Sequence, residues 1–403
     1  MSVVSAPVRS APVLDIDPFN VANLIDWLPI DRAIREAGPV AYLPQYDLWA
    51  VGGYDTVQNI FRDWENFSSA SGTGLTNVRK AQAWRKPSPI LEVDPPQHTR
   101  ARTVLARILS PGAINKLREA FRSEAEKVVE TVVAKGTFDA VPELIESFIF
   151  KVMPDAIGLP AEGRENLLPY ANLNFNAAGP RNELYDKALA AAGDSPQWVA
   201  DQCQADRLRP GSFGAQIFDA ASAGDLDAED APLLVRSFLT ASLDTTIYGI
   251  GLALHAFATN PEQWDILRGK PEAARSAFDE VLRFNAPSPY IARTTTRDIV
   301  VEGVEIPAES KVLLCLGAAN RDPRRWPDPD KFDLTRRTAG QMSFGTGIHG
   351  CVGQVVARLE AEVVLNALAT RVDRIELAAQ PVWRPTNWLR GLSSLPLTVH
   401  RKA

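Results

Sequence analysis

The sequence predicts a mainly α-helical fold with a minor β part, and two observations support this. Long stretches place apolar residues three and four positions apart, as one buried face of a helix requires: residues 113–133, 231–259, 273–284 and 354–369. Shorter apolar segments bounded by Pro, Gly or polar residues read as strands: residues 40–43, 48–51, 299–304, 311–316 and 395–399. We therefore expect a small sheet packed beside a larger helical part.

The composition is that of an enzyme-sized globular protein. The chain has 403 residues, of which 45% are hydrophobic and 23% are charged. Residues 1–14, rich in Ser, Ala and Pro, are expected to be a disordered tail, and residues 15–403 to form a single domain. The Pro- and Gly-containing stretch 179–214 is expected to form long mobile loops.

Charge and hydropathy argue against several classes of partner. The net charge of −6 comes from 43 basic and 49 acidic residues without a long run of one sign, so nucleic acid is not expected. No segment approaches the ~18 consecutive apolar residues of a membrane span, and the first residues lack a secretory signal pattern. We expect a cytoplasmic monomer. The three cysteines contain no Cys-x-x-Cys pair, so neither a disulfide framework nor a zinc site is predicted.

The most informative segment is the glycine-rich loop 344–353, which a helical pattern follows at once. Gly345, Gly347 and Gly350 spell G-x-G-x-x-G, which would suggest a nicotinamide-dependent dehydrogenase. That interpretation requires a buried strand directly before the glycines and an acidic residue at the end of the next strand. Residues 336–343 are not a buried strand, and Asp373 lies before the next strand-like segment. The dehydrogenase is therefore a distant alternative.

A second interpretation of this loop centres on Cys351. Glycines let the backbone pass close beneath a flat macrocycle. A cysteine at a helix start lies near free N–H groups and the positive end of the dipole, which favours the thiolate. Phe344 could shield the sulfur from water. A thiolate ligand pushes electron density onto a haem iron and favours O–O cleavage, so Cys351 is the predicted iron ligand.

The loop resembles the haem-binding signature of the cytochrome P450 family. The pattern F-x-x-G-x-x-x-C-x-G is matched at Phe344, Gly347, Cys351 and Gly353. The resemblance extends over residues 15–403 and implies one cytochrome P450 catalytic domain. In it, haem b lies between a long central helix and the cysteine-bearing loop. It also implies that the haem propionates bind four residues: His98 and Arg102, which match H-x-x-x-R, together with Arg293 and His349.

A second family signature is the segment 280–283. Glu280 and Arg283 lie three residues apart, so they share one face of a helix and can pair. The resemblance implies that Arg336 joins this pair. The family's usual Pro near that position is Leu334 here.

The apolar helical stretch 231–259 is interrupted by polar residues at 244–246. One interpretation is a break, with Asp244 capping a new helix. The other is an acid and alcohol pair above the haem, in which a Thr hydroxyl bonds back to the preceding turn and opens a groove for oxygen. The family motif (Ala/Gly)-Gly-x-(Asp/Glu)-Thr is matched at Ala241, Asp244 and Thr245, with Ser242 in place of Gly. It implies that Asp244 and Thr245 relay protons.

A narrower resemblance is to soluble bacterial cytochromes P450 that oxidise para-substituted benzoates, notably 4-methoxybenzoate O-demethylases. It implies that Arg85, Ser88, Arg236 and Ser237 hold a substrate carboxylate about two helical turns from Asp244. The remaining pocket residues implied by the resemblance are Leu91, Phe175, Ala178, Thr240, Ala241 and Ile291. Ala178 and Ile291 replace phenylalanines of those relatives, so we expect room for longer para substituents.

The implied reaction inserts one oxygen atom of O2 into a C–H bond, converting 4-methoxybenzoate to 4-hydroxybenzoate. The expected electron source is NAD(P)H, through a reductase and an iron–sulfur ferredoxin. Two alternatives remain open: a cytochrome P450 that hydroxylates another small aromatic or hydrophobic acid, and a haem-thiolate protein that uses peroxide.

Overall fold

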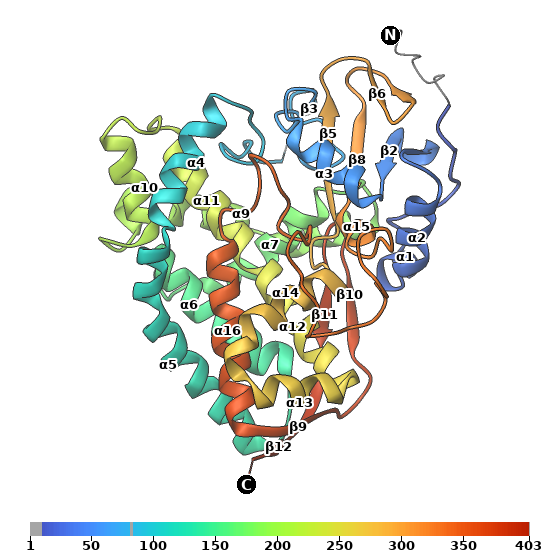
Figure 1. Ribbon diagram of the computed structural model, residues 1–403. Coiled ribbons are helices and arrows are strands. Elements are labelled where there is room, and N and C mark those ends of the chain that lie inside the picture. Colours follow the sequence, from blue (N-terminus) through green and yellow to red (C-terminus); the bar gives the residue numbers. More distant parts are fainter. Residues whose placement is uncertain (1–9, 81–83, 403) are drawn as a thin grey trace.

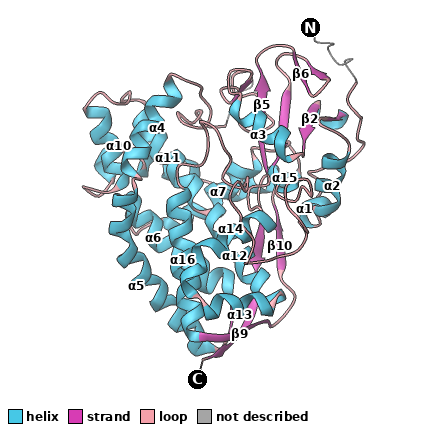
Figure 2. Ribbon diagram, viewed as in Figure 1, coloured by secondary structure: helices cyan, strands magenta, loops and turns pink. Residues whose placement is uncertain are grey.

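The computed structural model describes residues 10–80 and 84–402, and it has a helical part and a smaller β-rich part (Figures 1 and 2). Within the described residues the longer helices are α4 (Gln97–Ile108), α5 (Pro111–Lys135), α6 (Ser147–Ile157), α7 (Leu167–Asn176), α8 (Glu183–Ala192), α9 (Ser195–Gln202), α10 (Phe213–Ser222), α11 (Asp230–Ser242), α12 (Asp244–Thr259), α13 (Pro261–Gly269), α14 (Ala274–Phe284) and α16 (Gln354–Arg371). Near the sheet lie the shorter α1 (Val21–Ile25), α2 (Leu28–Glu36), α3 (Tyr54–Arg62) and α15 (Leu316–Ala319).

The β-rich part is built around a five-stranded sheet in the order β1-β2-β8-β5-β3. Its strands are β1 (Ala41–Leu43), β2 (Leu48–Val51), β3 (Phe67–Ser68), β5 (Tyr290–Thr295) and β8 (Lys311–Cys315). β2 and β8 are parallel and the other pairs are antiparallel. The remaining strands form a three-stranded sheet, β4 (Thr137–Asp139), β12 (Pro396–Arg401) and β9 (Val372–Leu377), and two hairpins, β6 (Ile299–Val301) with β7 (Val304–Ile306) and β10 (Val382–Pro385) with β11 (Arg390–Ser394). The mainly α architecture with minor β is therefore confirmed.

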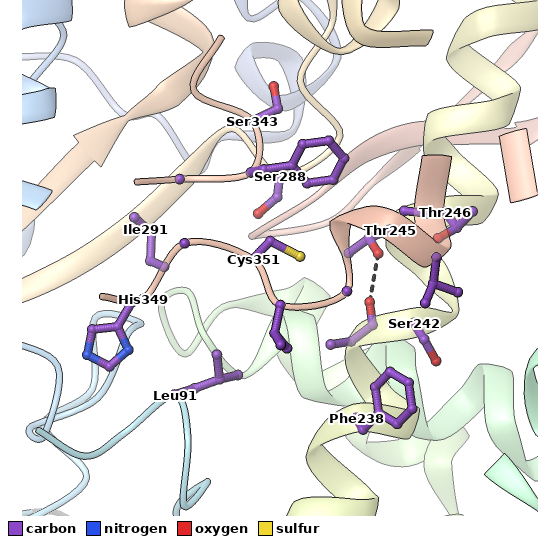
Figure 3. Close-up of a pocket in the computed structure, with 18 of the residues that line it drawn as sticks. Leu91, Phe238, Ser242, Thr245, Thr246, Ser288, Ile291, Ser343, His349 and Cys351 are labelled. Carbon is purple, nitrogen blue, oxygen red and sulfur yellow. Dashed lines mark hydrogen bonds between the residues drawn. The ribbon is translucent and has the colours of Figure 1, made fainter. Parts of the chain in front are cut away.

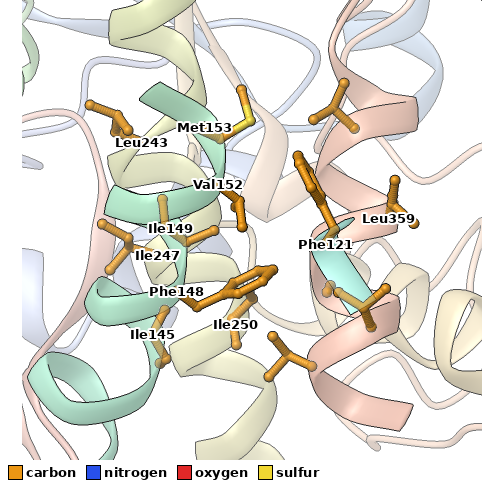
Figure 4. Packing of buried hydrophobic residues seen from close by; sticks show 14 of the residues in the cluster. Phe121, Ile145, Phe148, Ile149, Val152, Met153, Leu243, Ile247, Ile250 and Leu359 are labelled. Carbon is orange, nitrogen blue, oxygen red and sulfur yellow. The ribbon is translucent and has the colours of Figure 1, made fainter. Parts of the chain in front are cut away.

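The helical core forms where α5, α6, α12 and α16 pack together (Figure 4). Phe121 of α5 and Phe148 of α6 meet edge to face, with ring centroids 6.3 Å apart. Ile247 and Ile250 of α12 pack against the same cluster, together with Leu359 of α16. Because aromatic and aliphatic burial is the main source of folding free energy, this cluster fixes α12 against α16. Those two helices carry residues of the candidate site.

Two expectations about order are wrong. The tail was expected to extend to residue 14, but Val13 bridges Tyr42 of β1, with Tyr42 N–H bonded to the Pro12 carbonyl. Backbone pairing with the sheet edge therefore orders the chain before residue 15, and residues 1–9 lie outside the described part.

Residues 179–214 are not a long loop, because they contain α8 and α9. The Asn182 side chain caps α8 by accepting the Tyr185 N–H, and Val199 of α9 is fully buried.

Of the described residues, no helix combines the length and apolar character needed to cross a membrane.

Candidate functional site

The predicted helix 231–259 is broken at Leu243. This residue has φ −95° and ψ −84°, outside the helical region, so α11 ends at Ser242 and α12 begins at Asp244. The Thr245 hydroxyl donates to the Ala241 carbonyl at 2.7 Å, and the Ser242 hydroxyl donates to Leu239 at 2.9 Å. Side-chain hydroxyls thus satisfy carbonyls at the break. Asp244 does not cap α12, because its side chain makes no capping bond.

The glycine loop passes under the cavity in a conformation that requires glycine. Gly347 has φ +70°, and a Cβ at this position would lie 2.4 Å from the Phe61 carbonyl oxygen. Gly345 has φ +63°. The loop closes on itself where the Cys351 N–H donates to the Phe344 carbonyl at 2.7 Å. These contacts hold Cys351 just ahead of α16.

The sulfur of Cys351 borders a mainly apolar cavity, and Cys351 is half-buried. Burial raises the pKa of its thiol, while the backbone N–H groups of Gly353 and Gln354 and the guanidinium of Arg102 act in the opposite direction. The contacts at the helix start therefore act in the expected direction, while desolvation of the thiolate raises the thiol pKa by more. The Arg358 guanidinium lies 4.4 Å from the centroid of the Phe344 ring, beside the loop.

Four cationic or potentially cationic side chains gather near the loop. The His98 and His349 rings are 4.2 Å apart, and the buried Nε2 atom of each has no hydrogen-bond partner. Burial lowers the pKa of His349 to about 3, helped by nearby Arg293 and Arg102. Among the described residues, the recorded hydrogen bonds of the Arg102 and Arg293 guanidinium groups go only to the backbone carbonyls of Gly350 and Ala292. The two arginines bring positive charge to this cluster, and His98, Arg102 and His349 line the same cavity.

A cavity lies between the cysteine loop and the α11–α12 break (Figure 3). The Cys351 sulfur points across it toward the side that carries Thr245 and Ser242. The sequence-predicted residues in its wall are Leu91, His98, Arg102, Ser237, Ala241, Thr245, Ile291, Phe344, His349, Cys351 and Gly353. Its lining is mainly apolar, with Phe238 and Leu91 among the apolar side chains. The structure thus brings the cysteine loop, the H-x-x-x-R helix and the hydroxyl of the predicted oxygen motif into one cavity.

The predicted carboxylate-binding residues are divided between the cavity wall and a position outside it. Ser237 lines the cavity, and its hydroxyl donates to Leu233 at 2.7 Å. Arg85 does not line the cavity but forms an ion pair with the buried Glu92 at 2.8 Å. Its Nε also donates to Asn174. The Ser88 hydroxyl accepts from the Leu91 N–H at 3.2 Å, so it shapes the local turn.

Arg236 lies close enough to Arg85 for the two charges to repel, but it has different hydrogen-bond partners. Its guanidinium donates to the Lys86 carbonyl at 2.7 Å, and no described carboxylate forms an ion pair with it. Burial lowers its pKa, and Tyr170 is the strongest of the neighbours that oppose this effect. The Tyr170 hydroxyl is itself buried without a partner.

Three predicted wall residues are not in the cavity lining. Phe175 and Ala178 pack against the apolar cluster that contains Phe19 and Trp388. The Thr240 hydroxyl donates to the Arg236 carbonyl at 2.8 Å, within α11. Of the two positions expected to enlarge the pocket, Ile291 therefore borders it directly and Ala178 does not.

The expected ion-pair network beside the cysteine loop is present. Arg283 pairs with Glu280 at 2.7 Å, and both side chains are essentially fully buried. Arg336 reaches the same carboxylate at 3.3 Å despite Leu334. Arg283 also donates to the carbonyls of Asn320, Pro329 and Lys331. The network ties α14 to the segment leading to the cysteine loop, so its role is structural.

The sequence interpretation missed one acidic residue in the cavity. Glu360 of α16 lines the wall, is 1% exposed, and neither carboxyl oxygen has a hydrogen-bond partner. Burial raises its pKa well above the ordinary value, and Thr246 lies beside it. The sequence did contain a signal for Glu360: it is a single acidic residue on the apolar helix face that Val356 and Leu359 define.

Comparison with known proteins defines the class of the molecule as an oxidoreductase. Residues 273–390 match the family model described as Cytochrome P450. A relative named cytochrome p450 CYP199A2, from Rhodopseudomonas palustris, is 48% identical over 387 residues, covering 96% of this chain and 94% of that protein. The chain belongs to the cytochrome P450 family and is a monooxygenase.

Two further matches agree with this assignment. The 6-deoxyerythronolide B hydroxylase of Saccharopolyspora erythraea is 29% identical, covering 97% of this chain and 99% of that protein. The solved structure of cytochrome P450 CYP109Q5 from Chondromyces apiculatus superposes with a TM-score of 0.84 at 28% identity, covering 96% of this chain and 99% of that one. Family membership implies haem, O2 and electrons delivered from a reductase, and it excludes the dehydrogenase interpretation.

Proposed function

We propose that this cytochrome P450 oxidises para-substituted benzoates, with O-demethylation of 4-methoxybenzoate to 4-hydroxybenzoate as the leading reaction. The observation that carries the proposal is the pair of guanidinium groups of Arg85 and Arg236 next to the cavity wall. Arg236 directly precedes Ser237, which lines the cavity on the same helix as Ala241. A carboxylate is the substrate group that such a half-buried guanidinium and a buried hydroxyl would bind.

The residues around the cavity fit haem b. Two partnerless imidazole nitrogens, together with Arg102 and Arg293, match the need of two propionates for donors and positive charge. The Cys351 sulfur, which borders the same cavity, would ligate the iron, and coordination would deprotonate the thiol. When bound, haem with a thiolate ligand supplies the activation of O2 for insertion of one oxygen atom into a C–H bond.

The chain's own residues would then position the substrate. Arg236 and Ser237 lie in the middle of α11, and Thr245 lies just past the break at Leu243. A benzoate held at the Arg236 end would direct its para substituent toward the Thr245 end of the cavity. Apolar Leu91, Phe238 and Ile291 would hold the ring and exclude water. Such positioning selects which C–H bond reacts.

Protons would be handled at Thr245 and Asp244. The Thr245 hydroxyl faces the cavity, and its hydrogen bond to Ala241 holds it in place. Burial raises the pKa of Asp244 to about 7, so this carboxyl can both accept and release a proton near neutral pH. The electrons would come from NAD(P)H through a reductase and an iron–sulfur ferredoxin that docks near the Cys351 loop.

The distinguishing experiment is a spectral titration of the holoenzyme with matched acids and neutral amides. We expect 4-methoxybenzoate to bind at least ~30-fold more tightly than 4-methoxybenzamide, because losing a buried charge partner costs roughly 2 kcal/mol or more. Arg236→Leu should remove most of this preference, while Arg122→Leu, on an exposed face of α5, should retain it. 4-Ethoxybenzoate and 4-propoxybenzoate test the space beside Ile291. Equal dissociation constants for acid and amide would contradict a carboxylate substrate.

A further inference from the structure

Asp244 lies outside the cavity into which Thr245 points. Its side chain is 1% exposed, does not line the cavity, and its Oδ1 atom has no hydrogen-bond partner. After burial itself, the groups that act on its pKa are Arg384, which lowers it, and Glu146, which raises it. Glu146 lies in the turn of residues 141–146, which contacts α12, and Arg384 lies on β10, whose partner strand β11 contacts α12. A proton that reaches Thr245 through Asp244 would therefore come from the region of this turn and the β10–β11 hairpin.

Tyr248 connects these elements. It follows Asp244 by one helical turn on α12, and its buried hydroxyl lies close to the Arg384 guanidinium. Its ring lies directly on Gly391 of β11, where a Cβ would come within 2.2 Å of the ring. Gly391 pairs across the hairpin with Arg384 of β10, which places Arg384 next to the tyrosine. Only glycine at position 391 allows the ring to pack this closely.

Glu146 and Arg384 form the solvent side of this arrangement. Glu146 ends the π-helical turn η2 (Val141–Glu146), and both side chains are half-buried rather than enclosed. Burial raises the pKa of Glu146, Arg384 lowers it and Asp139 raises it. The turn, α12 and β11 all contact one another, and the β10–β11 hairpin lies beside α12 in Figure 1. The polar groups thus run from partly exposed Glu146 and Arg384 to the enclosed Tyr248 and Asp244.

We infer that Glu146, Arg384 and Tyr248 form the solvent-side end of the path that supplies protons to Asp244. A proton enters at the Glu146 carboxyl, the Tyr248 hydroxyl passes one proton to the Asp244 carboxylate and regains one from the solvent side, and no electron moves. Arg384 is a positioning residue that holds Glu146 and Tyr248 together. The inference rests on the proposed relay through Asp244 and Thr245.

The first test measures the protonation state of Asp244 without turnover. Infrared difference spectra of the holoenzyme against Asp244→Asn follow the carboxyl band of Asp244 as pH is varied. Glu146→Gln removes a neighbouring negative charge and should move the Asp244 midpoint below about 7, whereas Arg384→Leu should move it above. Arg374→Leu, on the exposed face of β9, is the matched control and should leave it unchanged. An unchanged midpoint in both test variants overturns the inference.

The second test separates the path from the relay itself. Tyr248→Phe removes only the hydroxyl, so the fold and the haem spectrum should persist. We expect product per electron consumed to fall by roughly tenfold, with a larger solvent isotope effect. Tyr42→Phe removes a hydroxyl on β1 that bonds to Asp47, and this control should behave as wild type. If Asp244→Asn uncouples turnover and Tyr248→Phe does not, the inference fails and the relay stands. If Asp244→Asn has no effect either, both fail.

Discussion

The Thr245 hydroxyl has two roles, one in the local helix geometry and one in the cavity. By donating to the Ala241 carbonyl at 2.7 Å, it satisfies an acceptor that the break at Leu243 leaves open. The same oxygen faces the cavity, where it can hold a proton. A serine keeps both capabilities, whereas an alanine loses them.

Thr245→Ala should therefore keep haem and substrate binding but divert electrons from product to hydrogen peroxide. We expect product per NAD(P)H to fall by tenfold or more, since a positioned proton donor contributes roughly 10² to 10⁴ in rate. Peroxide and product are quantified in the same reaction. Thr245→Ser is the control and should restore most of the coupling. Equal coupling in wild type and the alanine variant would remove Thr245 from proton handling.

Cys351 is the residue on which the cofactor assignment depends. Cys351→Ser should abolish the strongly red-shifted Soret band of the ferrous carbon monoxide complex, because a hydroxyl is a poor substitute for a thiolate. The absorption spectrum of the reduced protein under carbon monoxide measures this. Cys203→Ala changes a buried thiol elsewhere in the fold and should keep the band. A serine variant that keeps the band would exclude Cys351 as the ligand.

At the scale of elements, Asn387 ties the segment between α7 and α8 to the β10–β11 turn. Its side-chain amide donates to the carbonyls of Asn176 and Pro180 and to the Asn182 side chain, at 3.0 to 3.2 Å. Its backbone N–H donates to the Asn176 side chain at 3.0 Å. Asn387 is fully buried, and a Cβ at Gly179 would lie 2.4 Å from it. The contact fixes two loops that are distant in sequence.

Asn387→Ala should lower the free energy of unfolding by about 2 to 4 kcal/mol, because several buried polar groups lose their partners together. Denaturant titration gives the global effect, and hydrogen exchange of residues 176–183 gives the local one. Asn115→Ala on the exposed face of α5 should change stability by less than about 0.5 kcal/mol. Protection of 176–183 equal to wild type would show that other contacts hold this segment.

For the whole molecule, the raised pKa of Asp244 links stability to pH. Folding raises the pKa from its ordinary value near 4 to about 7, mainly through burial. Between these values the folded protein keeps a proton that the unfolded chain has released. Stability from this group is therefore present below about pH 4 and is lost as pH rises to about 7.

Asp244→Asn removes this titration, so its melting temperature relative to wild type should rise progressively between about pH 4 and pH 7. Other titrating groups are common to both proteins and cancel in the difference. Thermal melts of the two holoproteins over this range measure it. Parallel melting curves at every pH would mean that the folded-state pKa of Asp244 is close to its ordinary value.

The sequence by itself determined the class of fold and the residues of the cysteine loop. Helix and strand periodicity are local properties, so α5, α14 and α16 and the strands β1, β2 and β8 lie close to their predicted ranges. The cysteine loop could also be predicted from the sequence, because Gly347 and Cys351 stand at fixed spacings within ten residues. Helical spacing also allows the Glu280–Arg283 pair, and its place in the family's order of motifs supports it.

Only the tertiary structure determined the features that depend on contacts between segments distant in sequence. The cap at Asn182 and the burial of Val199 turned an expected loop into two helices. Burial outweighs the effect of the helix start on the Cys351 pKa, and Arg85 pairs with Glu92 away from the cavity wall. The packing of Tyr248 depends on Gly391, which lies 147 positions beyond Asp244 in the sequence. Burial and cross-chain pairing arise only on folding, so no local pattern records them.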